Sequence, residues 1–94
     1  MSDTESTVAV LYADISNSMT LFQALGDVRA REVIRLLFEG LQQRVSDQDG
    51  RVVKFIGDEV MCAFPSAECA ALAALAMQRH VSESRAEPPL SLRI

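Results

Sequence analysis

Residues 51–64 have the sequence RVVKFIGDEVMCAF, and the topology of the whole chain depends on them. Residues 51–56 and 59–64 are two short runs rich in β-forming side chains, and only Gly57-Asp58 separates them. Glycine at the first position of a two-residue connection accepts the positive φ that a tight hairpin turn requires. The stretch therefore predicts a β-hairpin with Asp58 in its turn.

Another strand is predicted upstream, at residues 8–13, which are continuously apolar and are followed by Asp14. An apolar run without alternation is typical of a strand that is buried on both faces, so we expect this strand in the middle of a sheet. Ser16 or Asn17 can cap the short helix that follows, and Gly26 ends that helix.

Two more helices and a last strand complete the pattern. Asp27 caps a long helix whose apolar residues recur every three or four positions and whose arginines lie on a solvated face. Ser66 caps a third helix that runs to about Ser82, with the alanines and leucines of 70–75 on its buried side. Residues 90–94 alternate in the way that a strand does. The predicted order of elements is βααββαβ.

This order predicts an α+β fold of the ferredoxin-like (palm-like) sandwich type. If the crossovers are right-handed, the compact arrangement is a four-stranded antiparallel sheet with the helices on one face. The first strand then lies beside the second strand of the hairpin, and the end of the first strand meets the hairpin turn. We therefore expect Asp14 and Asp58 to lie close together.

Two carboxylates at one edge of a sheet repel each other unless a cation lies between them. Oxygen ligands of this kind favour magnesium or manganese, and magnesium commonly combines one or two carboxylates with waters and substrate phosphates. The helix start that follows Asp14 aims unpaired backbone N–H groups at the same place. Two bound metals at Asp14 and Asp58 could activate a hydroxyl and stabilise a leaving pyrophosphate.

Composition sets the expected surroundings of this site. The 94 residues suffice for one domain, and a net charge of −4 gives no electrostatic footprint for nucleic acid or an anionic membrane. We expect no membrane span, because no run of about 18 apolar residues occurs. The polar N-terminus is unlike a secretory leader, and Cys62 and Cys69 resemble reduced core thiols. The expected compartment is the cytoplasm.

Two motifs together resemble a known family. LYADIS at residues 11–16, followed by a helix, and GRVVKFIGDEVMCAFP at 50–65 closely resemble the catalytic domain of class III adenylyl and guanylyl cyclases, from about Thr7 to Ile94. The resemblance implies conversion of ATP to cyclic AMP and pyrophosphate by a two-metal mechanism. It also implies that Asp14, Asp58 and the Ile15 carbonyl bind two Mg²⁺ or Mn²⁺ ions.

The same resemblance implies a base-reading residue and a partner. Lys54 matches the position that reads adenine in adenylyl cyclases, which favours ATP over GTP. In the family, the active sites form in a head-to-tail homodimer, so Lys54 and Asp58 of one chain would serve different sites.

The chain departs from the family pattern in two places. Where the family usually has Gly, then Phe or Ser, then Thr, this chain has Asn17, Ser18 and Met19, which we expect to contact the substrate. The family's transition-state asparagine and arginine lie beyond the position of Ile94. We therefore expect a cyclase domain, residues 1–94, truncated on its C-terminal side, with no catalytic residue of its own and little or no turnover.

Three alternatives stay open at this point. The aspartates taken singly are ordinary turn or helix-capping residues, Lys54 is an ordinary surface lysine, and His80 suits the surface near a helix end. Diguanylate cyclases share the palm-like fold and a Gly-Asp-Glu hairpin, although Lys54 favours the class III family. The chain could also be a noncatalytic nucleotide-binding or dimerisation module on the cyclase scaffold.

Overall fold

The elements follow one another in the order that the sequence predicts. A computed structural model describes residues 8–84 and 88–94 of the chain. The described elements are β1 (Ala9–Ser16), α1 (Ser18–Leu25), α2 (Asp27–Asp47), β2 (Arg51–Ile56), β3 (Glu59–Phe64), α3 (Ala67–Ser82) and β4 (Ser91–Arg93).

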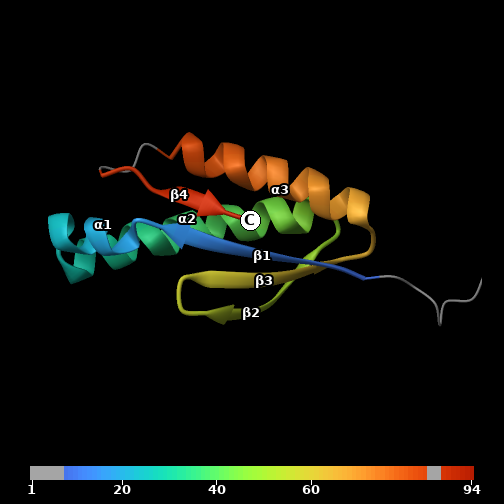
Figure 1. The fold of residues 1–94 in the computed structure, drawn as a ribbon, viewed down its shortest axis with the longest axis horizontal. Helices are drawn as coiled ribbons and strands as arrows, with labels where there is room; N and C mark the ends of the chain where they lie inside the picture. Colours follow the sequence, from blue (N-terminus) through green and yellow to red (C-terminus); the bar gives the residue numbers. More distant parts are fainter. Residues whose placement is uncertain (1–7, 85–87) are drawn as a thin grey trace, which may run out of the picture.

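The strands form one sheet in the order β2-β3-β1-β4, with every pair of neighbours antiparallel. Figure 1 shows α2 passing behind this sheet and α3 running alongside it. The α+β ferredoxin-like arrangement and the central place of β1 are therefore confirmed.

The prediction that β1 is buried on both faces is wrong. Leu11, Ala13 and Ile15 are buried against the helices, whereas Val10 and Tyr12 on the opposite face are each 48% exposed. Successive side chains of a strand point to opposite faces, and the helices bury only one of these faces. The other face of the sheet, which we call the open face, thus presents apolar side chains to its surroundings.

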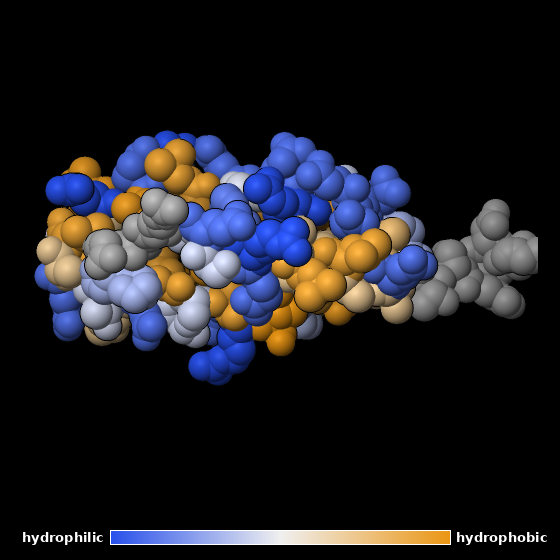
Figure 2. Space-filling view, turned by 90° about the horizontal axis from the view of Figure 1, so that it is seen from above, coloured by the Kyte–Doolittle hydropathy of each residue, from blue (hydrophilic) through white to orange (hydrophobic). Residues whose placement is uncertain are grey.

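All three helices contribute buried side chains to the core. These side chains are Leu21 of α1; Ala30, Leu37, Leu41 and Val45 of α2; and Ala73, Met77 and Val81 of α3. Contrary to the sequence-based expectation, Leu72 and Leu75 are 46% and 65% exposed. Figure 2, which views the molecule from the side of α3, shows hydrophobic residues at the surface among hydrophilic ones.

Local signals set most of the element ends. Gly57 has a φ of 61° in the two-residue turn between β2 and β3, as the hairpin prediction requires. The Ser66 hydroxyl oxygen accepts a hydrogen bond from the Cys69 amide at 3.1 Å, which caps α3 as predicted. Helix α2 begins at Asp27 itself, with Gly26 as its N-cap, so its start lies one residue earlier than expected.

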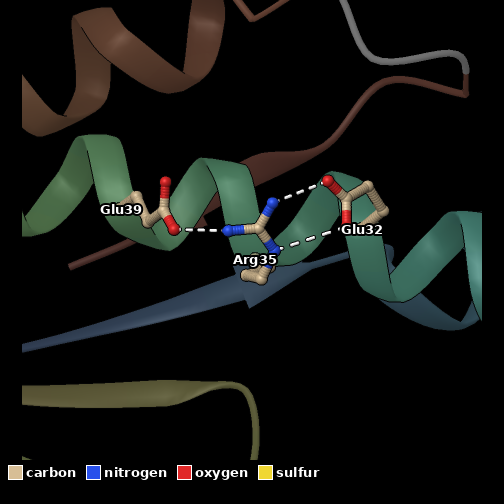
Figure 3. Close-up of polar contacts among 3 residues, drawn as sticks. All are labelled: Glu32, Arg35 and Glu39. Atoms are coloured by element: carbon tan, nitrogen blue, oxygen red, sulfur yellow. Dashed lines mark hydrogen bonds and ion pairs between the residues drawn. The ribbon is translucent and has the colours of Figure 1, made fainter.

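The exposed side of α2 carries a small cluster of charges. Arg35 donates to both Glu32 and Glu39, one turn away on either side (Figure 3). These pairs raise the pKa of Arg35 and lower that of Glu32, but the side chains are exposed, and solvent weakens such interactions. The prediction of a solvated face for Arg35 is confirmed. Within the described part of the chain, no helix has the length and apolarity needed to cross a bilayer.

Candidate functional site

The end of β1 meets the hairpin turn between β2 and β3. Asp14 is opposite Glu59 across the sheet, and the next residue, Ile15, donates its backbone N–H to the Asp58 carbonyl at 3.1 Å. The backbones of Asp14 and Asp58 therefore lie at one edge of the sheet, as the topology predicts.

Helix α1 begins beside the same turn and contributes a direct side-chain contact. Ser18, its first residue, donates its hydroxyl to Oδ2 of Asp58 at 2.6 Å. No local pattern relates two residues that are 40 positions apart, so this bond could not be found from the sequence. The sequence placed Ser18 only among the residues expected to contact the substrate.

Asn17 occupies the N-cap of α1 in a left-handed conformation, with φ 71° and ψ 18°. Its side chain makes no capping hydrogen bond, so the cap position is as predicted but the expected side-chain cap is not formed. The first N–H groups of a helix have no intrahelical acceptor. The start of α1 therefore offers backbone donors close to the Asp58 turn.

A hollow of about 390 Å³ adjoins this turn. It is lined by Ser18, Met19, Phe22, Gln23, Asp27 and Asp58. Met19, which the sequence placed in the substrate-contacting loop, is 71% exposed. The hollow thus combines two apolar side chains with carboxylates, an amide and a hydroxyl.

Lys54 lies on the same face of the sheet as Asp14, but at a distance from it. Lys54 is opposite Met61, which is opposite Tyr12, and residues that pair across strands share a face. Asp14 is two positions beyond Tyr12 and shares that face too. Two strand spacings of roughly 4.8 Å separate β2 from β1, so Lys54 is about 10 Å or more from Asp14.

The residues at this edge fit a magnesium or manganese ion better than zinc. Among the described residues there is no group of three or more His, Cys, Asp or Glu side chains that could hold a metal. Two carboxylates and a backbone carbonyl are hard oxygen donors, and Mg²⁺ completes such a set with waters and substrate phosphates. Cys62 belongs to the core, where burial raises the pKa of its thiol to about 11 and leaves it unreactive.

Comparison with known families identifies the class of protein. The model of the adenylate and guanylate cyclase catalytic domain matches residues 1–94, and the chain belongs to this family. No curated protein matches the chain by sequence.

Solved structures show the same fold. The chain is similar to the adenylyl cyclase CyaB from P. aeruginosa, with 20% identity and a TM-score of 0.80 over 92% of this chain and 52% of that one. It is also similar to adenylate cyclases from Trypanosoma brucei in their monomeric state, with 20% identity and a TM-score of 0.75 over 88% of this chain and 36% of that one.

A diguanylate cyclase shares the fold as well. The active GGEEF domain of a diguanylate cyclase from Vibrio cholerae has 20% identity and a TM-score of 0.75, over 90% of this chain and 57% of that one. The chain thus spans between 36% and 57% of these solved relatives.

Proposed function

We propose that this chain is part of an adenylate cyclase domain that converts ATP to cyclic AMP and pyrophosphate. Two Mg²⁺ or Mn²⁺ ions would be held by the carboxylates of Asp14 and Asp58 and by the Ile15 carbonyl. The observation that carries the proposal is the Ile15 N–H···O=C Asp58 hydrogen bond of 3.1 Å, which holds the hairpin turn against the end of β1. Family membership supports the same chemistry.

Each part of the site has a role in this reaction. The ribose 3′-hydroxyl attacks the α-phosphorus, the bond from that phosphorus to the β-phosphate oxygen breaks, and pyrophosphate leaves. The carboxylates of Asp14 and Asp58 and the Ile15 carbonyl would hold the ions, which would supply Lewis-acid chemistry that favours loss of the hydroxyl proton and neutralises charge on the leaving group. The backbone of residues 17–19, at the start of α1, is proposed to donate hydrogen bonds to the phosphates, because the first N–H groups of a helix have no intrahelical acceptor.

Lys54 is proposed to read the adenine ring in the site of a second copy. Its separation of about 10 Å or more from Asp14 favours a role outside its own metal site. The proposed head-to-tail homodimer would use the open face as its interface, which is supported by the apolar side chains of Val10, Tyr12 and Ile56, each 48% exposed there. ATP, a divalent ion and a second copy are the proposed partners, and the net charge of −4 gives no reason to add nucleic acid.

Residues 1–94 are proposed to form the N-terminal part of the cyclase domain. The cytoplasm is the proposed compartment, supported by two free cysteines.

Binding of Mn²⁺ and ATP to the chain tests this function. At a ligand concentration of about ten times Kd, binding stabilises the folded state by about 1.4 kcal/mol, which raises Tm by roughly 5–10 °C for a domain of this size. We expect this rise in the unchanged chain and its loss in Asp58→Asn. Arg35→Gln, a change of surface charge on α2, is the control and should keep the rise.

The alternatives give different results. If Mn²⁺ with ATP leaves Tm unchanged in the unchanged chain, the metal site is refuted and a noncatalytic dimerisation module is favoured. If GTP stabilises the chain and ATP does not, the assignment of ATP is wrong.

A further inference from the structure

The only hydrogen bond to the Asp58 side chain among the described residues comes from Ser18. Asp58 is exposed and follows Gly57, which has a φ of 61°, so packing does not fix its carboxylate. An exposed side chain without partners populates several rotamers. The Ser18 hydroxyl, at 2.6 Å from Oδ2, is therefore the contact that selects one of them.

The hydroxyl reaches Asp58 because the backbone has already been aligned. The Ile15 N–H holds the Asp58 carbonyl at 3.1 Å, and the left-handed Asn17 then turns the chain into α1, so that Ser18 faces the turn. A hydrogen bond from a hydroxyl to an ionised carboxylate is short and about twice as strong as a neutral one. The distance of 2.6 Å fits this class of bond.

A carboxylate has two oxygens, and the bond with Ser18 uses one of them. Oδ1 and a second lone pair of Oδ2 stay available as acceptors. Removal of a group that hydrogen-bonds to a metal-binding side chain commonly lowers metal affinity 10- to 100-fold. Ser18 makes a hydrogen bond of this kind to the Asp58 carboxylate.

We propose that Ser18 is a positioning residue, which holds the Asp58 carboxylate in the orientation that binds the divalent ion. This inference rests on the proposed function, because it requires a metal at Asp58. It gives the Ser18 side chain a role other than the predicted contact with the substrate, because the hydroxyl donates its hydrogen to Asp58. Ser18 does not cap α1, since Asn17 occupies the N-cap position.

Binding of Mn²⁺ alone, measured by the loss of the EPR signal of the free ion, tests this role. We expect Ser18→Ala to weaken Mn²⁺ binding by about tenfold or more. Ser18→Thr, which keeps the hydroxyl, should restore most of the affinity. Thr20→Ala removes a hydroxyl from an exposed position on the same helix and should bind Mn²⁺ as the unchanged chain does.

A second pair of variants separates positioning from folding. Valine has nearly the shape of threonine but lacks the hydroxyl. Comparison of Ser18→Val with Ser18→Thr therefore isolates the effect of the hydrogen bond, even if Ser18→Ala folds poorly. Circular dichroism establishes that each variant is folded. Weaker Mn²⁺ binding by Ser18→Val than by Ser18→Thr supports the role.

The outcomes distinguish the two proposals. If the unchanged chain binds Mn²⁺ and Asp58→Asn does not, yet Ser18→Ala and Ser18→Val bind as tightly as the unchanged chain, the role of Ser18 is refuted and the metal site stands. If Asp58→Asn binds Mn²⁺ as the unchanged chain does, the metal site fails, and the role of Ser18 fails with it.

Discussion

Asn17 connects β1 to α1 in a conformation that most residues avoid. Its φ of 71° and ψ of 18° lie in the left-handed region, where asparagine and glycine are tolerated and branched side chains are strained. We expect Asn17→Val to lower the free energy of unfolding by about 1–2 kcal/mol, and Asn17→Gly to change it by less than about 1 kcal/mol. Urea denaturation measures both values. Equal stability of the two variants would contradict this explanation of the loop.

Local chemistry decided which residues could be predicted from the sequence. The effects of Gly57 and Ser66 involve only residues within two or three positions along the chain. The hairpin turn and the α3 cap were therefore predictable. The contact between Ser18 and Asp58 depends on the packing of distant segments, and no nearby residue indicates it. The predicted metal-binding roles of Asp14, Ile15 and Asp58, and the substrate-binding roles of Lys54, Asn17 and Met19, stay predictions.

Helices α2 and α3 approach closely where Gly40 meets His80. A methyl group built on Gly40 would overlap three atoms of the His80 ring, namely Nε2, Cε1 and Cδ2. We expect Gly40→Ala to destabilise the fold by about 1–3 kcal/mol, because overpacking outweighs the roughly 1 kcal/mol that alanine gains in helix propensity.

A double variant shows whether the ring is the cause. In a His80→Ala background, Gly40→Ala should no longer destabilise, since the overlapping atoms are gone. Thermal denaturation of the four proteins gives the coupling between the two positions. A Gly40→Ala variant that is more stable than the unchanged chain would show that the helices do not pack as described.

The same helix pair predicts a dependence of stability on pH. Burial lowers the pKa of His80 below its ordinary value of 6.5, and Arg44 adds to this, while the Leu37 carbonyl and Glu83 act in the opposite direction. The unfolded chain therefore takes up a proton at higher pH than the folded chain does. The free energy of unfolding should be highest above pH 6.5 and fall as the pH drops below that value.

Urea denaturation between about pH 5.5 and 7.5 measures this effect. His80→Gln should remove the fall, because glutamine does not titrate. A fall of the same size in both proteins would show that other groups cause it.

The sequence suggested a surface position for His80, which is wrong in part: the residue is half-buried, and its Nε2 is buried with no hydrogen-bond partner among the described residues.

Element types were predictable because each has its own hydrophobic period, but the burial of each face was not. Leu11 and Tyr12 are both apolar and adjacent in β1, yet Leu11 is 7% exposed and Tyr12 is 48% exposed. Which of them is buried depends on the side of the sheet that the helices cover. The wrong prediction of burial for Leu72 and Leu75 has the same origin, because an apolar run on a helix does not show which side of the helix faces the sheet.

At the scale of the whole molecule, topology brings the candidate site together. The antiparallel order β2-β3-β1-β4 places the hairpin turn beside the end of β1, and helices on one face leave the opposite face of the sheet open. This arrangement followed from the order of elements and the handedness of crossovers, so it was predictable. The open face combines apolar side chains with Lys54 and Asp14, which suits the proposed second copy.

Paramagnetic broadening by Mn²⁺ in the presence of ATP is the most direct measurement of the proposed metal site. In amide NMR spectra of the chain, we expect the signals of Asp14, Ile15 and Asp58 to weaken first, and that of Gly40 on α2 to persist at the same Mn²⁺ concentration. Asp58→Asn should abolish the selective loss. Broadening that spares Asp14 and Asp58, or that is uniform along the chain, would contradict a divalent-ion site at this edge of the sheet.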